Sequence, residues 1–333
     1  MKRNLSLLIS LLVVANMAWA QQDPMFTKYM FNSLAFNPAY AGSNEHLSLG
    51  LLARNQWYGF KGAPESYSLT VHTPMKNERV GLGFAMVHDQ IGPTRTTGAN
   101  VSYSYRIPVG KNGAKLSIGL QGGFQNYYAD FSDVETEIKV DPAFTNRNIT
   151  KPNFGAGLYY STKKFYFGAG VPHLIEWNLR SKTGVPAGSY VGIQSRHYFF
   201  HTGGVIPLNG DALVFKPSIL VRNAGLLSKI NKDPNLKNIS APTSFNLDLS
   251  LLFYQKFWLG AAYSSSLEQF NATSSFNSVN LWTSYNLENG MRIGLAYDYA
   301  LTQIQSATVG SFELFLGYEF DYKTKKVATP RYF

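Results

Sequence analysis

The sequence predicts an all-β protein, an antiparallel transmembrane β-barrel of the outer-membrane type, with about fourteen strands, long extracellular loops and short periplasmic turns. Three observations predict this fold. From residue 46 onward, apolar and polar residues alternate with a period of two, which indicates strands with two different faces. Beyond the N-terminus no run of eighteen apolar residues occurs, so helical spans are not expected. Aromatic residues make up 15% of the chain and 29 residues are glycine, a composition that suits a barrel wall.

The N-terminus predicts export. A basic start and an apolar run over 5–14 are followed by Ala18-Trp19-Ala20, a small-residue pattern that signal peptidase cleaves. We therefore expect a signal peptide over residues 1–20, with Gln21 as the first mature residue. A core helix or a membrane anchor is the alternative, but the apolar run is too short to span a bilayer.

Composition excludes several other classes. The chain has no cysteine, which rules out an acylated-cysteine anchor, disulfides and thiolate metal sites. Its formal charge of +10 is scattered through short connections rather than gathered in a groove. We therefore expect no nucleic-acid partner.

The strand pattern places charges on one face only. In 291–301, Ile293 and Leu295 alternate with Arg292 and Asp298, and acids occupy the polar face of 244–254 and 311–320 in the same way. Acids on one face of three strands indicate a polar lumen rather than the core of a soluble sandwich.

Strands are expected near 46–54, 66–73, 79–89, 95–107, 114–129, 153–162, 164–171, 190–206, 211–222, 244–255, 257–265, 275–286, 291–300 and 308–320.

The connections alternate between short and long. With both ends of the barrel chain in the periplasm, the long ones, 55–65, 130–152, 172–189 and 223–243, fall on the external side. The sequence thus predicts one barrel domain over 46–320.

Two flanking segments complete the expected organisation. Residues 21–45 are too apolar for a solvated leader, so we expect a plug packed inside the barrel mouth, with a periplasmic docking strand or a simple lead-in as alternatives. The basic segment 321–333 is expected to be a periplasmic C-terminal tail, either solvated or docking a partner.

Searching for chemistry gives no catalytic, cofactor or metal site. His88 and Asp89 are adjacent in a predicted strand and therefore point to opposite faces. His197 and His201 would be separated by roughly 13 Å on a strand, too far for one metal ion. Gly81-Leu82-Gly83 and Gly155-Ala156-Gly157 lack the rest of a nucleotide-binding fingerprint, and we expect these glycines to relieve crowding in the wall. We therefore expect a protein that is not an enzyme.

After the cleavage site the sequence resembles the PorP/SprF family of type IX secretion membrane proteins, and the resemblance continues along the whole mature chain. The motifs that carry it include Asn37-Pro38-Ala39-Tyr40-Ala41-Gly42, Arg54-Asn55-Gln56-Trp57, Asp89-Gln90-Ile91-Gly92-Pro93, Arg196-His197-Tyr198-Phe199-Phe200 and Arg331-Tyr332-Phe333. The resemblance implies a Bacteroidetes outer-membrane barrel that serves type IX secretion. It also implies partners: exported cell-surface proteins such as gliding adhesins, recognised through their C-terminal domains, or periplasmic and motor subunits of the machinery.

Several of these motifs fall in predicted external loops. Their glycines and prolines would fix turns and pre-organise a surface, and aromatic residues would anchor a partner there. The alternative is that these loops only close the barrel. The candidate partner-binding residues are Trp57, Tyr58, Gly59, Phe60, Gly62, Ala63, Pro64, Asp89, Gly92, Pro93, Asp141, Pro142, Phe144, Pro172, His173, Ala241 and Pro242.

The alternative function is an outer-membrane channel for small solutes or fatty acids. A channel needs an open lumen, whereas Trp258, Trp282, Tyr198 and Phe200 are predicted to face the lumen and fill it. An outer-membrane hydrolase is a more distant alternative, because the sequence offers no Ser/His or Asp/His constellation.

Overall fold

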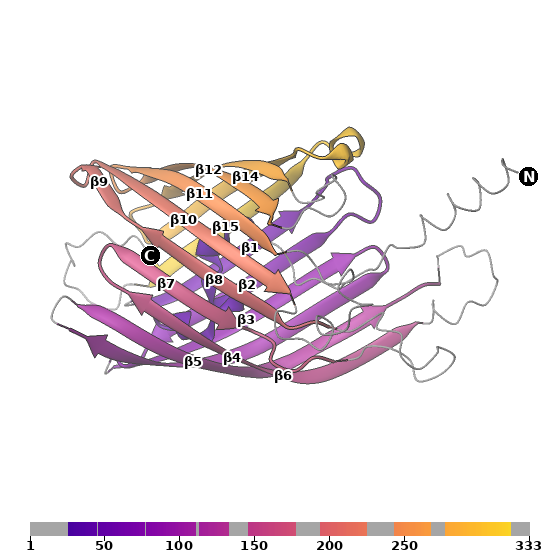
Figure 1. The fold of residues 1–333 in the computed structure, drawn as a ribbon, viewed down its shortest axis with the longest axis horizontal. Coiled ribbons are helices and arrows are strands. Elements are labelled where there is room, and N and C mark those ends of the chain that lie inside the picture. The colour runs from indigo at the N-terminus through magenta and orange to yellow at the C-terminus, as the bar shows by residue number, and fades with distance from the viewer. Residues whose placement is uncertain are drawn as a thin grey trace, which may run out of the picture.

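A closed antiparallel barrel forms the body of the computed structural model (Figure 1). The structure describes residues 26–44, 46–76, 78–110, 113–132, 146–177, 194–224, 243–267 and 277–320. Its strands are β1 (Leu47–Asn55), β2 (Glu65–Pro74), β3 (Val80–Ile91), β4 (Thr94–Val109), β5 (Ala114–Ala129), β6 (Arg147–Ser161), β7 (Phe165–Val171), β8 (His197–Gly204), β9 (Ile206–Asn209), β10 (Leu213–Ala224), β11 (Ser244–Phe253), β12 (Phe257–Ser266), β13 (Ser278–Asn286), β14 (Met291–Ala300) and β15 (Ser311–Phe320).

Apart from β8 and β9, strands that are neighbours in sequence pair with each other, and the pairing of the first strand with the last closes the barrel. β1 pairs with β15, and β8 and β9 both pair with β10, on either side of Val205. They therefore form one interrupted strand, and the wall has the fourteen strands that the sequence predicts.

Two strand starts differ most from the prediction. The strand expected to start at 190 begins at His197, and the one expected at 153 begins at Arg147. The extra residues of β6 pair with the end of β5, where Ala129 faces Arg147. They extend the hairpin with polar residues, so the apolar alternation on which the prediction depends is missing there.

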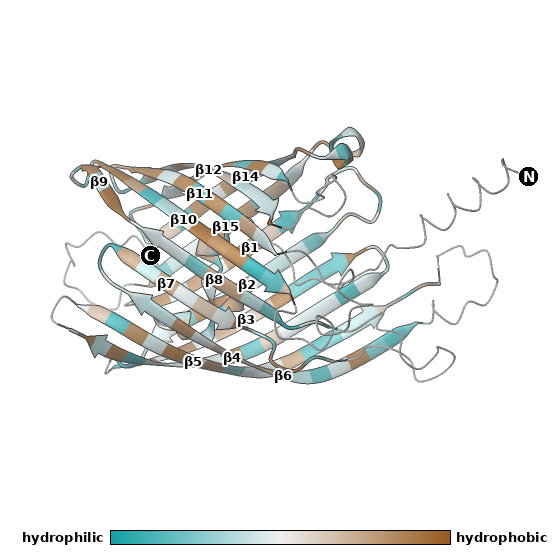
Figure 2. Ribbon diagram, in the orientation of Figure 1, coloured by the Kyte–Doolittle hydropathy of each residue, from teal (hydrophilic) through white to brown (hydrophobic). Residues whose placement is uncertain are grey.

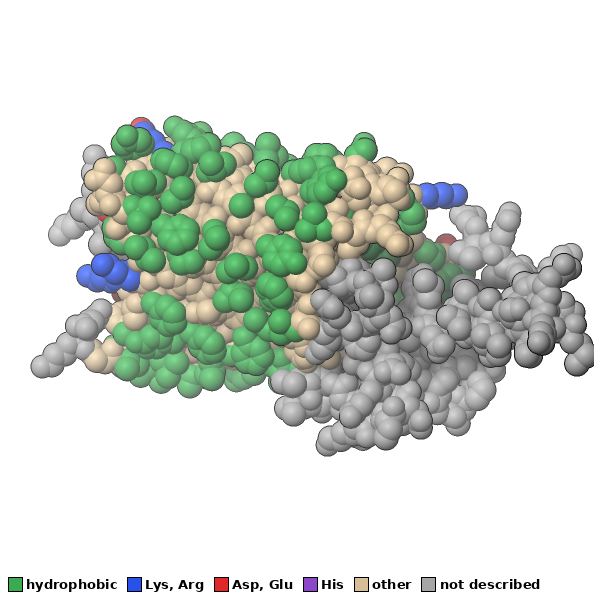
Figure 3. All heavy atoms as spheres, turned by 45° about the horizontal axis from the view of Figure 1, so that its top comes forward, with side chains coloured by type: hydrophobic (Ala, Val, Ile, Leu, Met, Phe, Trp, Pro, Cys, Tyr) green, Lys and Arg blue, Asp and Glu red, His purple; other side chains and the backbone are tan. Residues whose placement is uncertain are grey.

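The two faces of the wall differ in polarity. Figure 2 shows hydrophobic and hydrophilic residues alternating along the strands, and Figure 3 shows hydrophobic side chains spread over the outer face. Leucine and aromatic side chains cover the outside: Leu295 is 58% exposed and Leu120 is 60% exposed. Asp248, Asp298 and Glu313 face the lumen and are at most 3% exposed. This arrangement suits a wall with lipid outside and a polar interior.

The prediction of aromatic residues in the lumen was partly wrong. Trp258 and Trp282 are buried and stack against each other inside. In β8, however, Phe199 points inward and Phe200 is 37% exposed on the outer face. Tyr198 shares the face of Phe200 by strand parity, since a shift of one residue exchanges the two faces.

The connections are short at one end and mostly long at the other. The short ones lie between β2 and β3, β4 and β5, β6 and β7, β9 and β10, β11 and β12, and β13 and β14. The end that carries the longer connections is taken as external. There the link between β3 and β4 is only the tight turn at Gly92-Pro93. Among the described residues, no helix is long and apolar enough to cross a membrane.

A short helical segment precedes β1. It consists of η1 (Tyr29–Phe31), α2 (Ser33–Phe36) and η2 (Pro38–Tyr40), and a fourth short helix, η5 (Gln303–Ala307), lies in the external link before β15. In Figure 1 the indigo segment lies within the ring of strands. Residues 26–44, which we call the plug, therefore occupy the lumen.

Candidate functional site

The plug passes through the lumen from the external half to the periplasmic end. At its start, Thr27 contacts Glu313, close to the external end of β15. At its finish, the Gly42 amide donates to His72 Nδ1 near the periplasmic end of β2. The segment thus reaches much further than the barrel mouth predicted from the sequence.

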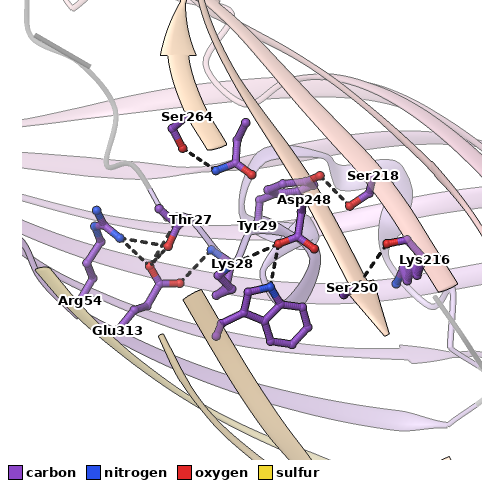
Figure 4. A network of polar contacts seen from close by, with 12 residues as sticks. Thr27, Lys28, Tyr29, Arg54, Lys216, Ser218, Asp248, Ser250, Ser264 and Glu313 are labelled. Carbon is purple, nitrogen blue, oxygen red and sulfur yellow. Dashed lines mark hydrogen bonds and ion pairs between the residues drawn. The ribbon is translucent and has the colours of Figure 1, made fainter. Parts of the chain in front are cut away.

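Buried charges hold the first residues of the plug (Figure 4). The Glu313 carboxylate accepts hydrogen bonds from the Thr27 and Lys28 amides at 3.1 and 2.9 Å and from the Thr27 hydroxyl at 2.8 Å. Arg54 donates to the same carboxylate at 2.9 Å and forms an ion pair with Asp298 at 2.6 Å. Because these groups are almost fully buried, removing one partner would leave a desolvated charge behind.

A second buried pair joins the plug to β11. Lys28 Nζ lies 3.1 Å from Asp248 Oδ2, and both side chains have no exposed surface. Trp282 Nε1 donates to the same oxygen at 2.8 Å, and Lys28 Nζ lies 4.9 Å from the Trp282 ring centroid. The Tyr29 hydroxyl adds a bond to Ser218 at 2.9 Å.

Glycines in the wall allow the plug backbone to come close. A Cβ at Gly119 would lie 2.1 Å from the Ala39 nitrogen, and a Cβ at Gly81 would lie 2.0 Å from the Ala41 carbonyl oxygen. Asn37 fixes the neighbouring turn by accepting from the Ala39 amide and donating to the Leu158 carbonyl. Glycine is therefore required at these wall positions by the plug rather than by strand geometry.

The plug separates two cavities. The external one, about 170 Å³, is lined by Phe26 and Thr27 of the plug and by Trp57, Pro172 and His173 of the wall and loops. The periplasmic one, about 300 Å³, lies beside Phe31 and Tyr40 of the plug. We call them the external cavity and the periplasmic cavity.

The loop between β1 and β2, residues 56–64, is a rigid part of the rim above the external cavity. The Gln56 amide donates to the Pro64 carbonyl at 2.9 Å, and the Phe60 amide donates to the Trp57 carbonyl at 3.0 Å. Trp57 has a φ of 53°, a conformation that side chains other than glycine seldom adopt. Its amide donates to Ser311 Oγ, which helps to hold this conformation.

Neighbouring loops are bonded to this one. The Tyr58 amide donates to the Gly310 carbonyl at 2.8 Å, and the Gly92 amide donates to the Gly62 carbonyl at 3.0 Å. Tyr58 is 54% exposed and Phe60 is 47% exposed. The rim therefore presents two exposed aromatic side chains on a backbone tied to the loops on both sides.

The structure brings most of the described candidate residues together, with one exception. Trp57, Pro172 and His173 share the external cavity, and the rest of the loop 57–64 meets the Gly92-Pro93 turn at the rim. Asp89, in contrast, is 7% exposed, points into the lumen and accepts a bond from Ser66 Oγ at 2.5 Å. It is not part of the external surface.

Other predicted positions lie outside the described residues. They are Asp141, Pro142, Phe144, Ala241 and Pro242 of the external loops and Ala18, Ala20 and Gln21 of the cleavage site. The signal peptide and the C-terminal tail also lie there.

The sequence did not predict the buried network of ion pairs that links the plug to the wall. The pattern had placed Asp248, Asp298 and Glu313 on the lumen face, but nothing in it paired them with Lys28 and Arg54. A cation in an otherwise apolar N-terminal segment was the available signal, since a buried lysine requires an acid.

Comparison with known proteins decides the family. The sequence matches the family described as type IX secretion system membrane protein PorP/SprF over residues 18–318. The chain belongs to the PorP/SprF family. It is therefore an outer-membrane β-barrel of the type IX secretion system.

A solved channel structure shares the fold of this PorP/SprF protein at low sequence identity. The CymD monoaromatic hydrocarbon channel matches with a TM-score of 0.51 and 12% identity, covering 88% of this chain and 93% of the channel. The Acinetobacter baumannii outer membrane protein Omp33 matches with a TM-score of 0.45 and 9% identity, covering 83% and 98%. A comparison with curated proteins found no match.

Proposed function

We propose that this PorP/SprF barrel binds an exported cell-surface protein, such as a gliding adhesin, at its external rim and anchors it or assists its export through the C-terminal domain of that protein. The observation that supports this proposal is the arrangement of aromatic side chains at the rim. Tyr58 and Phe60 are exposed on a loop that is hydrogen-bonded to the loops on both sides. A surface ordered in advance loses little entropy when a partner binds.

The chemistry of the rim suits a protein partner. Large aromatic side chains dominate the energetics of protein interfaces, and Trp57 adds a third one at the edge of the external cavity. Candidate residues from three segments, 57–64, 92–93 and 172–173, gather at this end of the barrel. A partner could therefore contact several loops at once.

The plug supports binding over transport. A channel for small solutes or fatty acids needs an open path, whereas residues 26–44 fill the middle of the lumen and are held by buried ion pairs. Trp258 and Trp282 add bulk at the same level.

The test is co-purification from native outer membranes in mild detergent. Wild type should recover a type IX cargo protein, identified by mass spectrometry, whose isolated C-terminal domain then binds the purified barrel. Tyr58→Ala combined with Phe60→Ala should weaken that binding tenfold or more. Tyr254→Ala is the matched control, because Tyr254 is 75% exposed in a turn at the opposite end.

Equal binding by the double variant and the control would show that the rim aromatics do not carry the interaction. Recovery of periplasmic and motor subunits without cargo would place the barrel in the core machinery instead.

A further inference from the structure

The external end of β6 has a neighbouring strand on one side only. β5 pairs with β6 along its whole length, over Arg147–Ser161. β7 pairs with it on the other side, but only from Ala156 onward. The first nine residues of β6 therefore form a sheet edge on the side of β7. A strand edge of this kind presents backbone donors and acceptors that another chain can pair with.

The chain that follows β7 covers part of this edge. The Leu174 amide donates to the Phe154 carbonyl at 2.8 Å. Trp177 Nε1 donates to the Pro152 carbonyl at 2.9 Å. The cover reaches no further toward the start of the strand. Residues 148–151, which we call the β6 edge, lie beyond it.

The backbone groups that point away from β5 follow from the alternation of the ladder. In an antiparallel strand, successive residues direct their N–H and C=O groups to opposite sides. The carbonyls of Phe154 and Pro152 point to the side of β7, so Thr150 and Asn148 present their N–H and C=O groups there as well. Within the part of the chain that the structure describes, no hydrogen bond reaches these groups from that side.

The β6 edge stands outside the lipid. Phe124 and Phe154 are 64% and 56% exposed on the outer face and belong to its apolar band. Beyond them the same face becomes polar, because the Asn126 amide donates to Asn148 Oδ1 at 2.7 Å and to Thr150 Oγ1 at 2.9 Å. Open sheet edges do not occur in the hydrocarbon region, so this edge faces water on the external side.

The charges of the β6 edge disfavour a second copy of the same chain. An antiparallel pair centred on Ile149 would put Lys151 of each copy opposite Arg147 of the other. Like charges directly opposite each other destabilise a strand pair, and a proline beside the edge, here Pro152, also limits self-pairing. A strand of a different protein avoids this repulsion.

Hydrogen bonds connect the β6 edge to the rim. The Gly92 amide donates to the Gly62 carbonyl at 3.0 Å, and the Asp130 amide, directly after β5, donates to the Pro93 carbonyl at 3.0 Å. β6 lies four strands from β2, which begins where the loop 56–64 ends, so the two surfaces are roughly 19 Å apart at the usual strand spacing. One protein domain can contact both.

We propose that the β6 edge binds an extended strand of the exported partner protein, which adds to the sheet through the N–H and C=O groups of Asn148 and Thr150. This inference rests on the proposed function, because the strand belongs to the protein that the rim binds. In strand addition, main-chain hydrogen bonds supply the affinity. Unpaired backbone groups in water, close to exposed aromatic side chains, fit an extended polypeptide.

The first experiment is hydrogen exchange, resolved to single amides, on the purified mature barrel in detergent. It is measured with and without the C-terminal domain of the cargo protein that co-purifies with the barrel. In the free barrel, the amides of Asn148 and Thr150 should exchange fast, whereas those of Ile149 and Lys151 point to β5 and should exchange slowly. Binding should slow exchange at Asn148 and Thr150.

A proline variant tests the backbone directly. Thr150→Pro removes an N–H that points away from β5, so the ladder between β5 and β6 stays intact. It should weaken binding of the cargo domain about tenfold, as expected when main-chain bonds at the edge are lost. Thr150→Val is the matched control, because it removes the hydroxyl and keeps the backbone donor. It should bind as wild type does. Asn148→Pro repeats the test should Thr150→Pro fail to fold.

The outcomes separate this inference from the proposed function. Equal binding by Thr150→Pro and Thr150→Val, or unchanged exchange at Asn148 and Thr150 in the complex, would overturn strand addition. The rim proposal would survive that result if Tyr58→Ala combined with Phe60→Ala still weakened binding. Recovery of no cargo protein with wild type would overturn both.

Discussion

The two halves of the lumen treat buried charge differently. In the external half, Arg54 is paired with two acids, and one of them, Glu313, also binds the plug backbone. In the periplasmic half, Lys216 and Arg292 face a cavity whose acidic lining residue is Glu319. Both halves are lined by the same alternating strands, so the difference comes from which residues occupy the inward positions.

Where cations and acids are matched, their geometry fixes a segment in place, because each buried group needs its partner. The comparison predicts that variants of the paired charges in the external half change stability.

The largest expected effect is that of Glu313→Ala. The change removes four hydrogen bonds to the plug and to Arg54 and leaves buried donors without a partner. We expect a loss of about 3–5 kcal/mol in the free energy of unfolding, the usual cost of breaking a buried ion pair. Urea unfolding in detergent, followed by tryptophan fluorescence, measures it.

Glu319→Ala is the matched control on the same strand. It removes an acid that lines the periplasmic cavity, away from the first residues of the plug, so its effect should stay within about 0.5 kcal/mol. Similar losses in the two variants would contradict the distinction between the halves.

A smaller effect is expected from Gly119→Ala, which acts on the plug from the wall. Its new Cβ would lie 2.1 Å from the Ala39 nitrogen, so either the plug or the strand must move. Overpacking of this kind costs about 1–3 kcal/mol, and a displaced plug should raise ion conductance in planar bilayers. Gly122→Ala in the same strand is the control, because its Cβ would meet only the Phe154 ring at 3.5 Å. Unchanged conductance in both variants would show that the plug does not yield at this point.

The wall was predictable from sequence because each strand carries its own two-faced pattern. β15, with Phe312 and Leu314 outward and Glu313 inward, shows the alternation within ten residues. The prediction for Phe200 was wrong because this two-faced pattern is missing there. Tyr198, Phe199 and Phe200 are three aromatic residues in a row, and such a run does not indicate which face each residue occupies.

The plug contacts were not predictable in the same way. Lys28 and Asp248 are 220 residues apart, and no local pattern links a helical turn to a strand so distant. The apolar character of the N-terminal segment predicted burial, whereas its path and its partners depend on wall glycines such as Gly119. Long-range pairing of this kind is decided by the closed barrel rather than by any single element.

The smallest effect is expected at the surface. Lys256 and Glu288 form an ion pair at 2.7 Å, with the side chains 48% and 84% exposed. Hydrogen bonding between them raises the pKa of Lys256 and lowers the pKa of Glu288. A carboxyl with a lowered pKa contributes its stability above its unfolded-state value and loses it as pH falls through the folded-state value. Water and salt screen this pair, so Lys256→Gln should leave the urea midpoint unchanged at neutral pH, and acidification should affect wild type and variant alike. A clear loss of stability in Lys256→Gln would show that charge at the periplasmic turns stabilises the barrel as the buried pairs do.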